Sequence, residues 1–346
     1  MKNRTHTFNI DINWSLIGLI SKIDRFDASW SSIEIREGQS LKQLKSIATI
    51  RSVGASTRIE GSGMSNEEVE ILLRNIDITK LEDRDSQEVV GYFETLDIIS
   101  ESYQDINITE SGLKNLHNIL LKHSNKDSWH KGEYKQHSNA VEVSYSDGTK
   151  RIIFETTEAG FPTEDAIRSL IEWYKSDTET HPLVKCALFS YEFVSIHPFQ
   201  DGNGRLSRLI ATLLLLKNGY KWVQYVSFEH EIESRKDEYY RVLRNCQSQR
   251  PNENITDWVT FFFSALLNIQ SQLIEKLEVT GMKSQLSPKE KSILIFIGNH
   301  SGCKSGEISK KLDIPNPTTK RILTELLKKN LIEKHGNGPG TNYSLK

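Results

Sequence analysis

Twelve consecutive residues, from His197 to Arg208, bring together side chains that can act on a nucleotide. They read His-Pro-Phe-Gln-Asp-Gly-Asn-Gly-Arg-Leu-Ser-Arg and lead into an apolar run over 209–216. His197 titrates near neutral pH and can accept a proton from a hydroxyl group. Asp201 can hold Mg²⁺, which proteins usually bind through one or two carboxylates together with substrate phosphates. An ordinary turn would explain the Asp-Gly-Asn-Gly letters, but it would not require the histidine and the arginines at these spacings.

These side chains must be positioned by a loop that feeds a helix. Gly202 and Gly204 allow positive φ angles, so successive N–H groups can turn toward an anion. A helix that begins near Gly204 or Arg205 adds the positive end of its dipole to this concavity. Arg205 and Arg208 lie three residues apart, and both guanidinium groups are predicted to reach the same side and bind phosphate oxygens.

The same stretch resembles the core motif of the Fic family, His-x-Phe-x-(Asp or Glu)-Gly-Asn-Gly-Arg-x-x-Arg, and matches it without a gap. Fic proteins are mostly adenylyltransferases. The resemblance therefore implies transfer of AMP from ATP to a Tyr, Thr or Ser hydroxyl of a target protein, the chain itself included, with release of pyrophosphate. It implies that His197 is the base, that Phe199 packs in the core and that Asp201 holds Mg²⁺. In this family the Gly-Asn-Gly segment forms the anion hole, and the two arginines clamp the β- and γ-phosphates. The nucleotide-binding residues that the resemblance implies are Asp201, Gly202, Asn203, Gly204, Arg205, Leu206, Ser207 and Arg208.

A second informative stretch, Ser56 to Gly61, precedes the core motif. Its serine and glutamate are four residues apart, one helical turn, and Gly61 suits a helix end. Spacing alone would equally allow Glu60 to be a solvated surface carboxylate. The stretch resembles the inhibitory helix of many Fic proteins, (Ser or Thr)-x-x-x-Glu-(Gly or Asn), whose glutamate pairs with the second arginine of the core motif, here Arg208. The resemblance implies an inhibitory helix at about 54–61 and low resting activity, because a carboxylate on Arg208 removes the partner of the γ-phosphate.

Between residues 132 and 159 the pattern changes to that of a hairpin. Apolar residues alternate at Val141, Val143 and Tyr145, Asp147-Gly148 is a turn signal, and Ile152, Ile153 and Phe154 follow. This segment resembles the Fic flap, which pairs with an extended piece of the target. The residues implied to dock the target are Asn139, Ala140, Val141, Glu142 and Val143. The usual arginine after Gly132 appears as Lys135 and the usual aromatic after Asn139 as Ala140, and the hairpin is longer than expected.

The rest of the first 280 residues reads as helices that pack around the motif. Helices are predicted to begin near Asn13 and Ser65, the latter with a capping box to Glu68, and to span about 41–54, 88–99, 161–174, 182–197, 205–217, 235–246 and 256–277. Tyr239 and Tyr240 resemble a tyrosine pair that lines the adenosine pocket in related proteins. Packing in the core is an equal alternative for two aromatic residues on a helix.

The C-terminal part of the chain forms a separate basic module. Residues 282–346 carry twelve Lys and Arg against five Asp and Glu, a net charge of +7, which leaves −9 for the remainder of the chain. Three helices, about 288–299, 305–312 and 317–330, precede two short strands around Gly336-Asn337-Gly338-Pro339-Gly340, a pattern that resembles a winged helix. Such a module places its third helix in the DNA major groove or serves as a protein-binding or dimerising unit, and the sequence leaves both open.

Composition supports a cytoplasmic protein that does not bind membranes. The chain is 37% hydrophobic and 26% charged, with no apolar run long enough for a membrane span and no signal-peptide pattern after Met1. Its cysteines, three in number and widely spaced, predict neither a disulfide framework nor a zinc site.

The predicted architecture is mainly α: a Fic-type helical bundle with a β-hairpin flap, followed by a small winged-helix domain. We expect an N-terminal helical region over 1–110, a catalytic core over 111–280 and the winged helix over 283–346. The predicted function is protein adenylyl transfer with Mg²⁺ and ATP, autoinhibited by Glu60. The alternatives are a Fic enzyme that uses another donor or removes AMP, and a regulator that senses nucleotide and binds DNA. The oligomeric state stays open, although a homodimer would hold the inhibitory helix in place.

Overall fold

The computed structural model of the chain describes residues 7–144, 150–284, 286–336 and 338–346. The chain divides into two compact units, Met1–Gln272 and Leu273–Lys346. Both are built mainly of helices, which confirms the predicted fold class. Among the described residues, no helix combines the length and apolar character that crossing a membrane requires.

The first element, α1 (Trp14–Ile59), is one helix where the sequence analysis expected two. The helix begins close to the predicted position, and the Asn13 side chain caps its N-terminus. No proline interrupts it, and buried residues recur every seven positions, two helical turns, at Leu16, Ile23 and Trp30. This burial keeps the first half of the helix on the core. The helix ends before Gly61, whose φ of 102° only glycine adopts without strain.

The helices that follow pack α1 against the centre of the unit. They are α2 (Asn66–Arg74), the 3₁₀ turn η1 (Ile78–Lys80), α3 (Arg84–Ser102) and α4 (Glu110–Leu120). The predicted capping box of Ser65 and Glu68 is confirmed at the start of α2. In turn, α3 contacts α1, α4 and α7, so its side chains can reach the loop ahead of α7.

A two-stranded antiparallel hairpin forms the only sheet described in the first unit. It consists of β1 (Ala140–Ser144) and β2 (Lys150–Glu155), with Ala140 opposite Glu155 and an irregularity in register after Val141. The predicted strands are therefore present. Tyr145 and the predicted Asp147-Gly148 turn lie outside the described residues.

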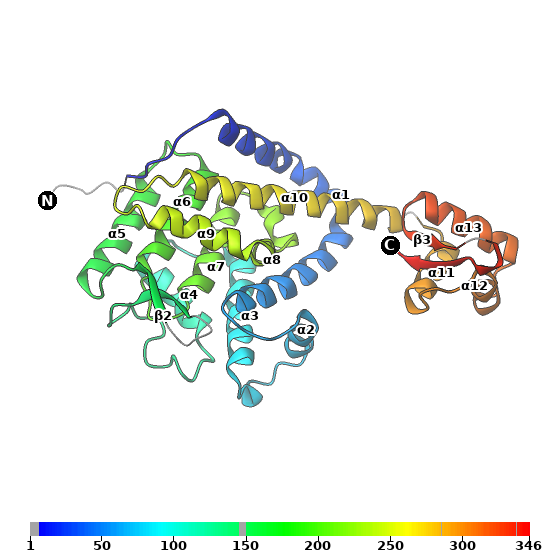
Figure 1. Ribbon diagram of the computed structural model, residues 1–346, viewed down its shortest axis with the longest axis horizontal. Helices are drawn as coiled ribbons and strands as arrows, with labels where there is room; N and C mark the ends of the chain where they lie inside the picture. Colours follow the sequence, from blue (N-terminus) through cyan, green and yellow to red (C-terminus); the bar gives the residue numbers. More distant parts are fainter. Residues whose placement is uncertain (1–6, 145–149, 285, 337) are drawn as a thin grey trace. The chain divides into compact units, whose positions relative to one another are not determined.

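The remaining helices that begin in the first unit are α5 (Phe161–Ser176), α6 (Pro182–Ile196), α7 (Asn203–Lys217), η2 (Lys221–Tyr225), α8 (Phe228–Ser234), α9 (Lys236–Gln247) and α10 (Thr256–Ser284). Figure 1 shows these elements, from green to yellow. Nearly every side chain of α6 and α7 is buried, and the two helices pack against each other. The core motif is the short connection between these two helices, so the most rigid part of the unit positions it.

The second unit contains α11 (Pro288–Asn299), α12 (Ser305–Leu312) and α13 (Asn316–Lys328), followed by β3 (Ile332–His335), the 3₁₀ turn η3 (Gly338–Gly340) and β4 (Asn342–Leu345). The strands pair antiparallel, with Ile332 opposite Leu345. Its own apolar core includes Ile293, Ile297, Ile308, Ile322, Leu326 and Tyr343. Three helices and a terminal two-stranded sheet are the predicted winged-helix elements.

Candidate nucleotide-binding and catalytic site

A cavity of about 510 Å³ collects most of the core motif in one place. Its walls are the α6–α7 connection, the first turn of α7, one face of α9 and the C-terminal end of α1. The lining residues named by the sequence analysis are Glu60, His197, Asp201, Gly202, Asn203, Gly204, Arg205, Arg208, Tyr239 and Tyr240.

His197 is held in a strained backbone conformation at the end of α6. Its φ of 55° and ψ of 59° place it in the left-handed region, which histidine rarely occupies. Its Nδ1 lies 3.2 Å from the carbonyl oxygen of Val194. Because a carbonyl oxygen can only accept, Nδ1 carries the hydrogen and Nε2 keeps its lone pair. Burial, aided by the charge of Lys135, lowers the pKa of His197 to about 4, against the opposing effects of Val194, Glu60 and Asp201. At neutral pH the imidazole is therefore an unprotonated base.

The loop that follows is closed by the Asn203 side chain. Its Oδ1 accepts from the Phe199 N–H at 2.9 Å and its Nδ2 donates to the Phe199 carbonyl at 2.8 Å. Both ends of the Asn203 amide are therefore used within the loop, so this side chain holds the loop closed. Only backbone N–H groups remain for an anion at this position, where the first turn of a helix leaves them without intrahelical acceptors.

His117, on α4, packs against the same loop and was not identified from the sequence. Its ring stacks on Phe199 with centroids 3.8 Å apart, and both side chains are fully buried. Its Nδ1 accepts from the Gly132 N–H at 2.9 Å, so Nε2 carries the hydrogen and donates to the Asp201 carbonyl at 3.0 Å. Burial lowers the pKa of His117 to about 4, which keeps the ring neutral and this tautomer fixed.

The N-terminus of α7 begins one or two residues earlier than predicted, at Asn203, with Gly202 as its cap at φ 79°. Of the two glycines expected to adopt positive φ, only Gly202 does so. Gly204 lies inside the helix, and its lack of a side chain has another reason. A Cβ atom at Gly204 would overlap Glu60 Oε1 and press on Arg208. This glycine therefore leaves room for the carboxylate of α1.

The Asp201 carboxylate lies at the edge of the cavity in charged form. Although burial alone would raise the pKa of Asp201, the nearby Arg205 guanidinium and the Gly202 N–H lower it. The Gly202 N–H donates to Asp201 Oδ1 at 2.5 Å, and Arg205 Nη2 lies 3.5 Å from the same oxygen. The described residues contain no cluster of three His, Cys, Asp or Glu side chains that could hold a metal alone. A single ionised carboxylate beside an anion site fits Mg²⁺ that is shared with substrate phosphates.

Arg208 is fixed by the C-terminal turn of α1. Its Nε donates to Ser56 Oγ at 2.8 Å, and its Nη2 donates to the Ser56 carbonyl at 3.0 Å and to Glu60 Oε1 at 2.8 Å. Arg208 and Ser56 are buried, whereas the Glu60 side chain keeps 30% of its exposure. Burial alone would raise the pKa of Glu60, but the charge and hydrogen bond of Arg208 lower it, so the carboxylate is ionised. Arg208 thus has an acidic partner inside the cavity.

Arg205 faces a different carboxylate. Its Nη1 lies 3.2 Å from Glu88 Oε2 on α3, and both side chains are almost fully buried. Both arginines line the cavity, as helical spacing predicts, but each is already paired with a carboxylate, so neither is a free cation. Glu88 was not identified from the sequence because it lies on a distant helix whose contact with α7 is a tertiary feature.

Two other residues assigned to nucleotide binding point away from the cavity. Leu206 is fully buried in the core, and the hydroxyl of Ser207 donates to the Ser190 carbonyl of α6 at 3.3 Å. Neither side chain lines the cavity, which corrects their assignment as side-chain contacts. Both Tyr239 and Tyr240 do line it, while Tyr239 also packs on Trp258, so the pocket and core interpretations apply together.

One face of α9 supplies residues that the sequence analysis missed. In addition to the tyrosines, the cavity is lined by Lys236, Leu243, Arg244 and Gln247. These positions follow the three- and four-residue spacing of a helix face. Once the tyrosines had been assigned to the pocket, that spacing would have predicted the others.

The flap begins directly beside the motif. Asn139 Nδ2 donates to the Phe199 carbonyl at 3.0 Å, which connects the residue before β1 to the loop of His197. Ala140, Val141, Glu142 and Val143 follow as backbone of β1. The structure thus places the start of the hairpin next to the catalytic loop.

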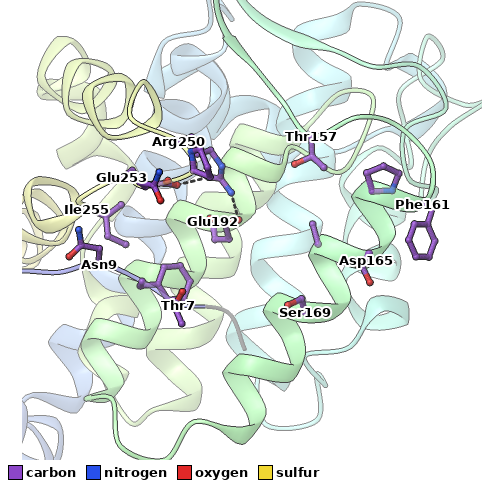
Figure 2. A pocket seen from close by; sticks show the side chains of 15 residues that line it. Thr7, Asn9, Thr157, Phe161, Asp165, Ser169, Glu192, Arg250, Glu253 and Ile255 are labelled. Carbon is purple, nitrogen blue, oxygen red and sulfur yellow. Dashed lines mark hydrogen bonds and ion pairs between the residues drawn. The ribbon is translucent and has the colours of Figure 1, made fainter. Parts of the chain in front are cut away.

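A larger cavity, of about 940 Å³, lies between the N-terminal segment, α5, α6 and residues 250–255. Figure 2 shows Arg250 directed toward Glu192 and Glu253. Arg250 forms ion pairs with both carboxylates, at 3.2 Å in the case of Glu253. Arg250, Glu192 and Glu253 are thus paired with one another, and none of the residues assigned to catalysis lines this larger cavity.

Comparison with known proteins supports the assignment of both parts of the chain. Residues 107–215 match the Fic/DOC family, and residues 284–340 match the MarR family. The chain is 29% identical over 214 residues to "Protein adenylyltransferase Fic" of Drosophila virilis. This match covers 59% of this chain and 39% of the relative. The Drosophila erecta protein of the same name is 25% identical over 328 residues, and that match covers 87% of this chain and 61% of the relative. The chain therefore spans only part of the length of these relatives.

Among solved structures, a Fic family protein from Desulfovibrio desulfuricans has the same fold along nearly the whole chain. The TM-score is 0.65 at 24% identity, covering 99% of this chain and 98% of that one. Together with the cavity described above, these similarities identify the two parts: the chain contains a Fic domain, followed by a MarR-type winged-helix domain.

Proposed function

We propose that the chain is a Mg²⁺-dependent protein adenylyltransferase that Glu60 holds in an inhibited state. The observation that carries the proposal is that one cavity of about 510 Å³ is lined by His197, the N-terminus of α7 and the Glu60-bound Arg208. The Fic adenylyltransferases of Drosophila, 25–29% identical, support the reaction class.

In the proposed reaction, His197 Nε2 accepts the proton of a Tyr, Thr or Ser hydroxyl as the hydroxyl oxygen attacks the α-phosphorus of ATP. The bond from the α-phosphorus to the oxygen that bridges to the β-phosphate breaks, and pyrophosphate leaves. AMP remains on the target as a phosphodiester. Positioning and charge stabilisation supply most of the rate enhancement in such transfers.

Different residues of the cavity bind different parts of the nucleotide. The backbone N–H groups at the start of α7 bind phosphate oxygens, and the adenine ring packs on Tyr239, Tyr240 and Leu243 of α9. Asp201 would hold Mg²⁺, which supplies charge neutralisation and orients the leaving group when bound. Lys236 and Arg244 add positive charge to the same wall.

The Glu60 to Arg208 pair accounts for the inhibition. Arg208 is the cation available for the terminal phosphates, and its Nη2 is already bound to Glu60 Oε1 at 2.8 Å. A triphosphate in the productive position would place its own negative charge against this ionised carboxylate. ATP therefore binds with its α-phosphate away from the line of attack until Glu60 is displaced.

The β1 to β2 hairpin is the proposed docking surface for the target. An extended target segment would pair with the backbone of Ala140 to Val143, and this brings its hydroxyl to His197. Pairing of this kind depends on backbone more than on side chains, so it suits several targets, the chain itself included.

The donor can be tested with ATP labelled at either the α- or the γ-phosphate. Glu60→Gly protein should retain label from α-labelled ATP and none from γ-labelled ATP, and Glu67→Gly, at an exposed position on α2, controls for the glycine substitution. Label from the γ-position alone would contradict adenylyl transfer and indicate a phosphotransferase. Label from UTP in preference to ATP would indicate another donor, and loss of label from AMP-modified protein would indicate AMP removal.

A second function, DNA binding by the winged-helix domain, is favoured by the charges on α13. Lys320 and Arg321 are exposed and form no ion pair with any residue that the structure describes, whereas Lys328 and Lys329 pair with Glu325 and Glu290. Free cations on the third helix are available for phosphates. Replacing Lys320 and Arg321 together by Glu should weaken binding of the full chain to duplex DNA by about tenfold or more, while Lys328→Glu should have a smaller effect. Binding that is equally weak and independent of salt in all three proteins would exclude this function.

A further inference from the structure

Lys135 is a buried cation at the point where the hairpin meets the catalytic loop. Its side chain is 2% exposed. Its Nζ donates to Asn139 Oδ1 at 3.0 Å, to Thr156 Oγ1 at 2.8 Å and to the carbonyl of Ile196 at 3.3 Å. An ammonium group has three hydrogens, so these acceptors use its full capacity.

The three acceptors come from three different segments. Asn139 directly precedes β1, Thr156 directly follows β2, and Ile196 directly precedes His197. Thr156 Oγ1 also lies 2.7 Å from the Asn139 carbonyl, which closes the base of the hairpin. One ammonium group therefore joins both ends of the hairpin to the residue before the base.

Backbone contacts connect the same segments. The Lys135 N–H donates to the Pro198 carbonyl at 2.9 Å, on the other side of His197. Lys135 thus contacts the chain immediately before and immediately after the catalytic histidine. These two contacts hold the backbone on both sides of His197, whose positive φ is a conformation that the surrounding structure must stabilise.

The charge of Lys135 has a separate effect from its hydrogen bonds. Within the described part of the chain, its acceptors are neutral oxygens and no carboxylate pairs with it, so burial lowers the pKa of Lys135 to about 8. The charged groups that act on His197 are Lys135, Glu60 at the end of α1 and Asp201 in the loop. The two carboxylates favour the imidazolium form, and Lys135 opposes them.

We propose that Lys135 is a positioning residue that clamps both ends of the β1 to β2 hairpin to the segment carrying His197, so that a docked target and the base keep a fixed geometry. The inference rests on the proposed function, because it assumes that the hairpin docks the target. Its structural part, the clamp itself, can be measured without any transfer activity.

The test compares Lys135→Met, which keeps the length of the side chain and removes its charge and donors, with Lys135→Arg, which keeps both. Hydrogen–deuterium exchange should show faster exchange of the β1 and β2 amides in Lys135→Met, by about tenfold or more, and near-normal exchange in Lys135→Arg. NMR titration should show a higher pKa for His197 in Lys135→Met only, with the resonance assigned by loss in His197→Asn. Unchanged hairpin exchange together with an unchanged His197 titration would overturn the proposal.

Self-labelling from α-labelled ATP in a Glu60→Gly background adds the functional measurement. Lys135→Met should lower the rate about tenfold or more, and Lys135→Arg should restore most of it. If Glu60→Gly itself takes up no label, the proposed function fails while exchange and titration still decide the role of Lys135. If Lys135→Met does not fold, Thr156→Val serves in its place, because it removes one acceptor without changing charge. Hairpin exchange in Thr156→Val equal to that of the unaltered protein would then count against the clamp.

Discussion

At the residue scale, the proposed chemistry depends on two neutral histidines with opposite tautomers. His197 carries its hydrogen on Nδ1, which frees Nε2 to act as the base, and His117 carries its hydrogen on Nε2, which supports the loop. Backbone groups set each tautomer: the Val194 carbonyl for His197, and the Gly132 N–H together with the Asp201 carbonyl for His117. These contacts therefore decide whether the imidazole has a free nitrogen lone pair or holds the backbone in place.

Replacing His117 by Phe should keep the stacking on Phe199 but lose both hydrogen bonds. The buried Gly132 N–H and Asp201 carbonyl would then lack partners, at a cost of about 2 to 5 kcal/mol in the free energy of unfolding. Urea denaturation would measure the change, with His137→Phe, at an exposed position in the same region, as the control. An unfolding free energy equal to that of the unaltered chain would show that His117 does not support the loop.

The residues of the core motif could be identified from sequence because they are contiguous and their types are specific. Apart from Glu60, the partner of Arg208, the residues that contact the motif could not be identified in this way. Glu88, His117 and Lys135 come from separate segments, and their contacts with the motif exist only after α3, α4 and the hairpin have packed on the α6–α7 connection. The same limit applies to Arg205, because local helical geometry does not show that the tertiary structure pairs it with Glu88.

At the element scale, the end of α1 is held in place by contacts that do not involve Glu60. Arg58 Nε and Nη2 donate to the two oxygens of Glu233 on α8, at 2.6 and 3.0 Å. Lys236 Nζ of α9 donates to the Ile59 carbonyl at 2.8 Å. Since Lys236 also lines the cavity, the proposed inhibitory segment is attached to the wall that we propose binds the nucleotide.

Weakening this attachment should therefore weaken the inhibition. Glu233→Gln removes the charge that Arg58 pairs with, and we expect self-labelling to rise severalfold, although less than in Glu60→Gly, where the inhibitory carboxylate is absent. Glu238→Gln, which breaks a more exposed pair with Arg235 on α9, is the matched control. Equal labelling in the two variants would mean that the Arg58 to Glu233 pair does not hold the inhibitory turn.

Element boundaries followed from the sequence where local signals were strong, as with the capping box of α2 and the proline at the start of α6. The continuity of α1 was not predicted. Residues between the two expected helices have a mixed apolar and charged pattern, and they stay helical because Ile23 and Trp30 are buried by packing, which no local pattern encodes.

At the scale of the whole molecule, the fully buried His117 and the partly buried His197 make stability depend on pH. Burial lowers the pKa of both His117 and His197 to about 4, below the ordinary value of 6.5 that the unfolded chain retains. The unfolded state therefore binds more protons below pH 6.5, and stability falls as the pH drops from 6.5 toward 4. For the fully buried His117 the loss should reach about 3 kcal/mol.

Unfolding measured at pH 7, 5.5 and 4.5 would show this loss directly. The His117→Phe variant should be less stable at pH 7 but should lose less on acidification, since it has one titrating group fewer. A pH dependence that is the same in both proteins would show that His117 is not held neutral in the folded state.

The central claim, an inhibited adenylyltransferase whose base is His197, is tested most directly by one labelling experiment. The unaltered chain, Glu60→Gly and Glu60→Gly with His197→Ala are incubated with Mg²⁺ and α-labelled ATP, and label on protein is followed. Strong label in Glu60→Gly, weak label in the unaltered chain and none in the double variant is the predicted result. Label in the double variant equal to that in Glu60→Gly, or no label in any of the three proteins, would contradict it.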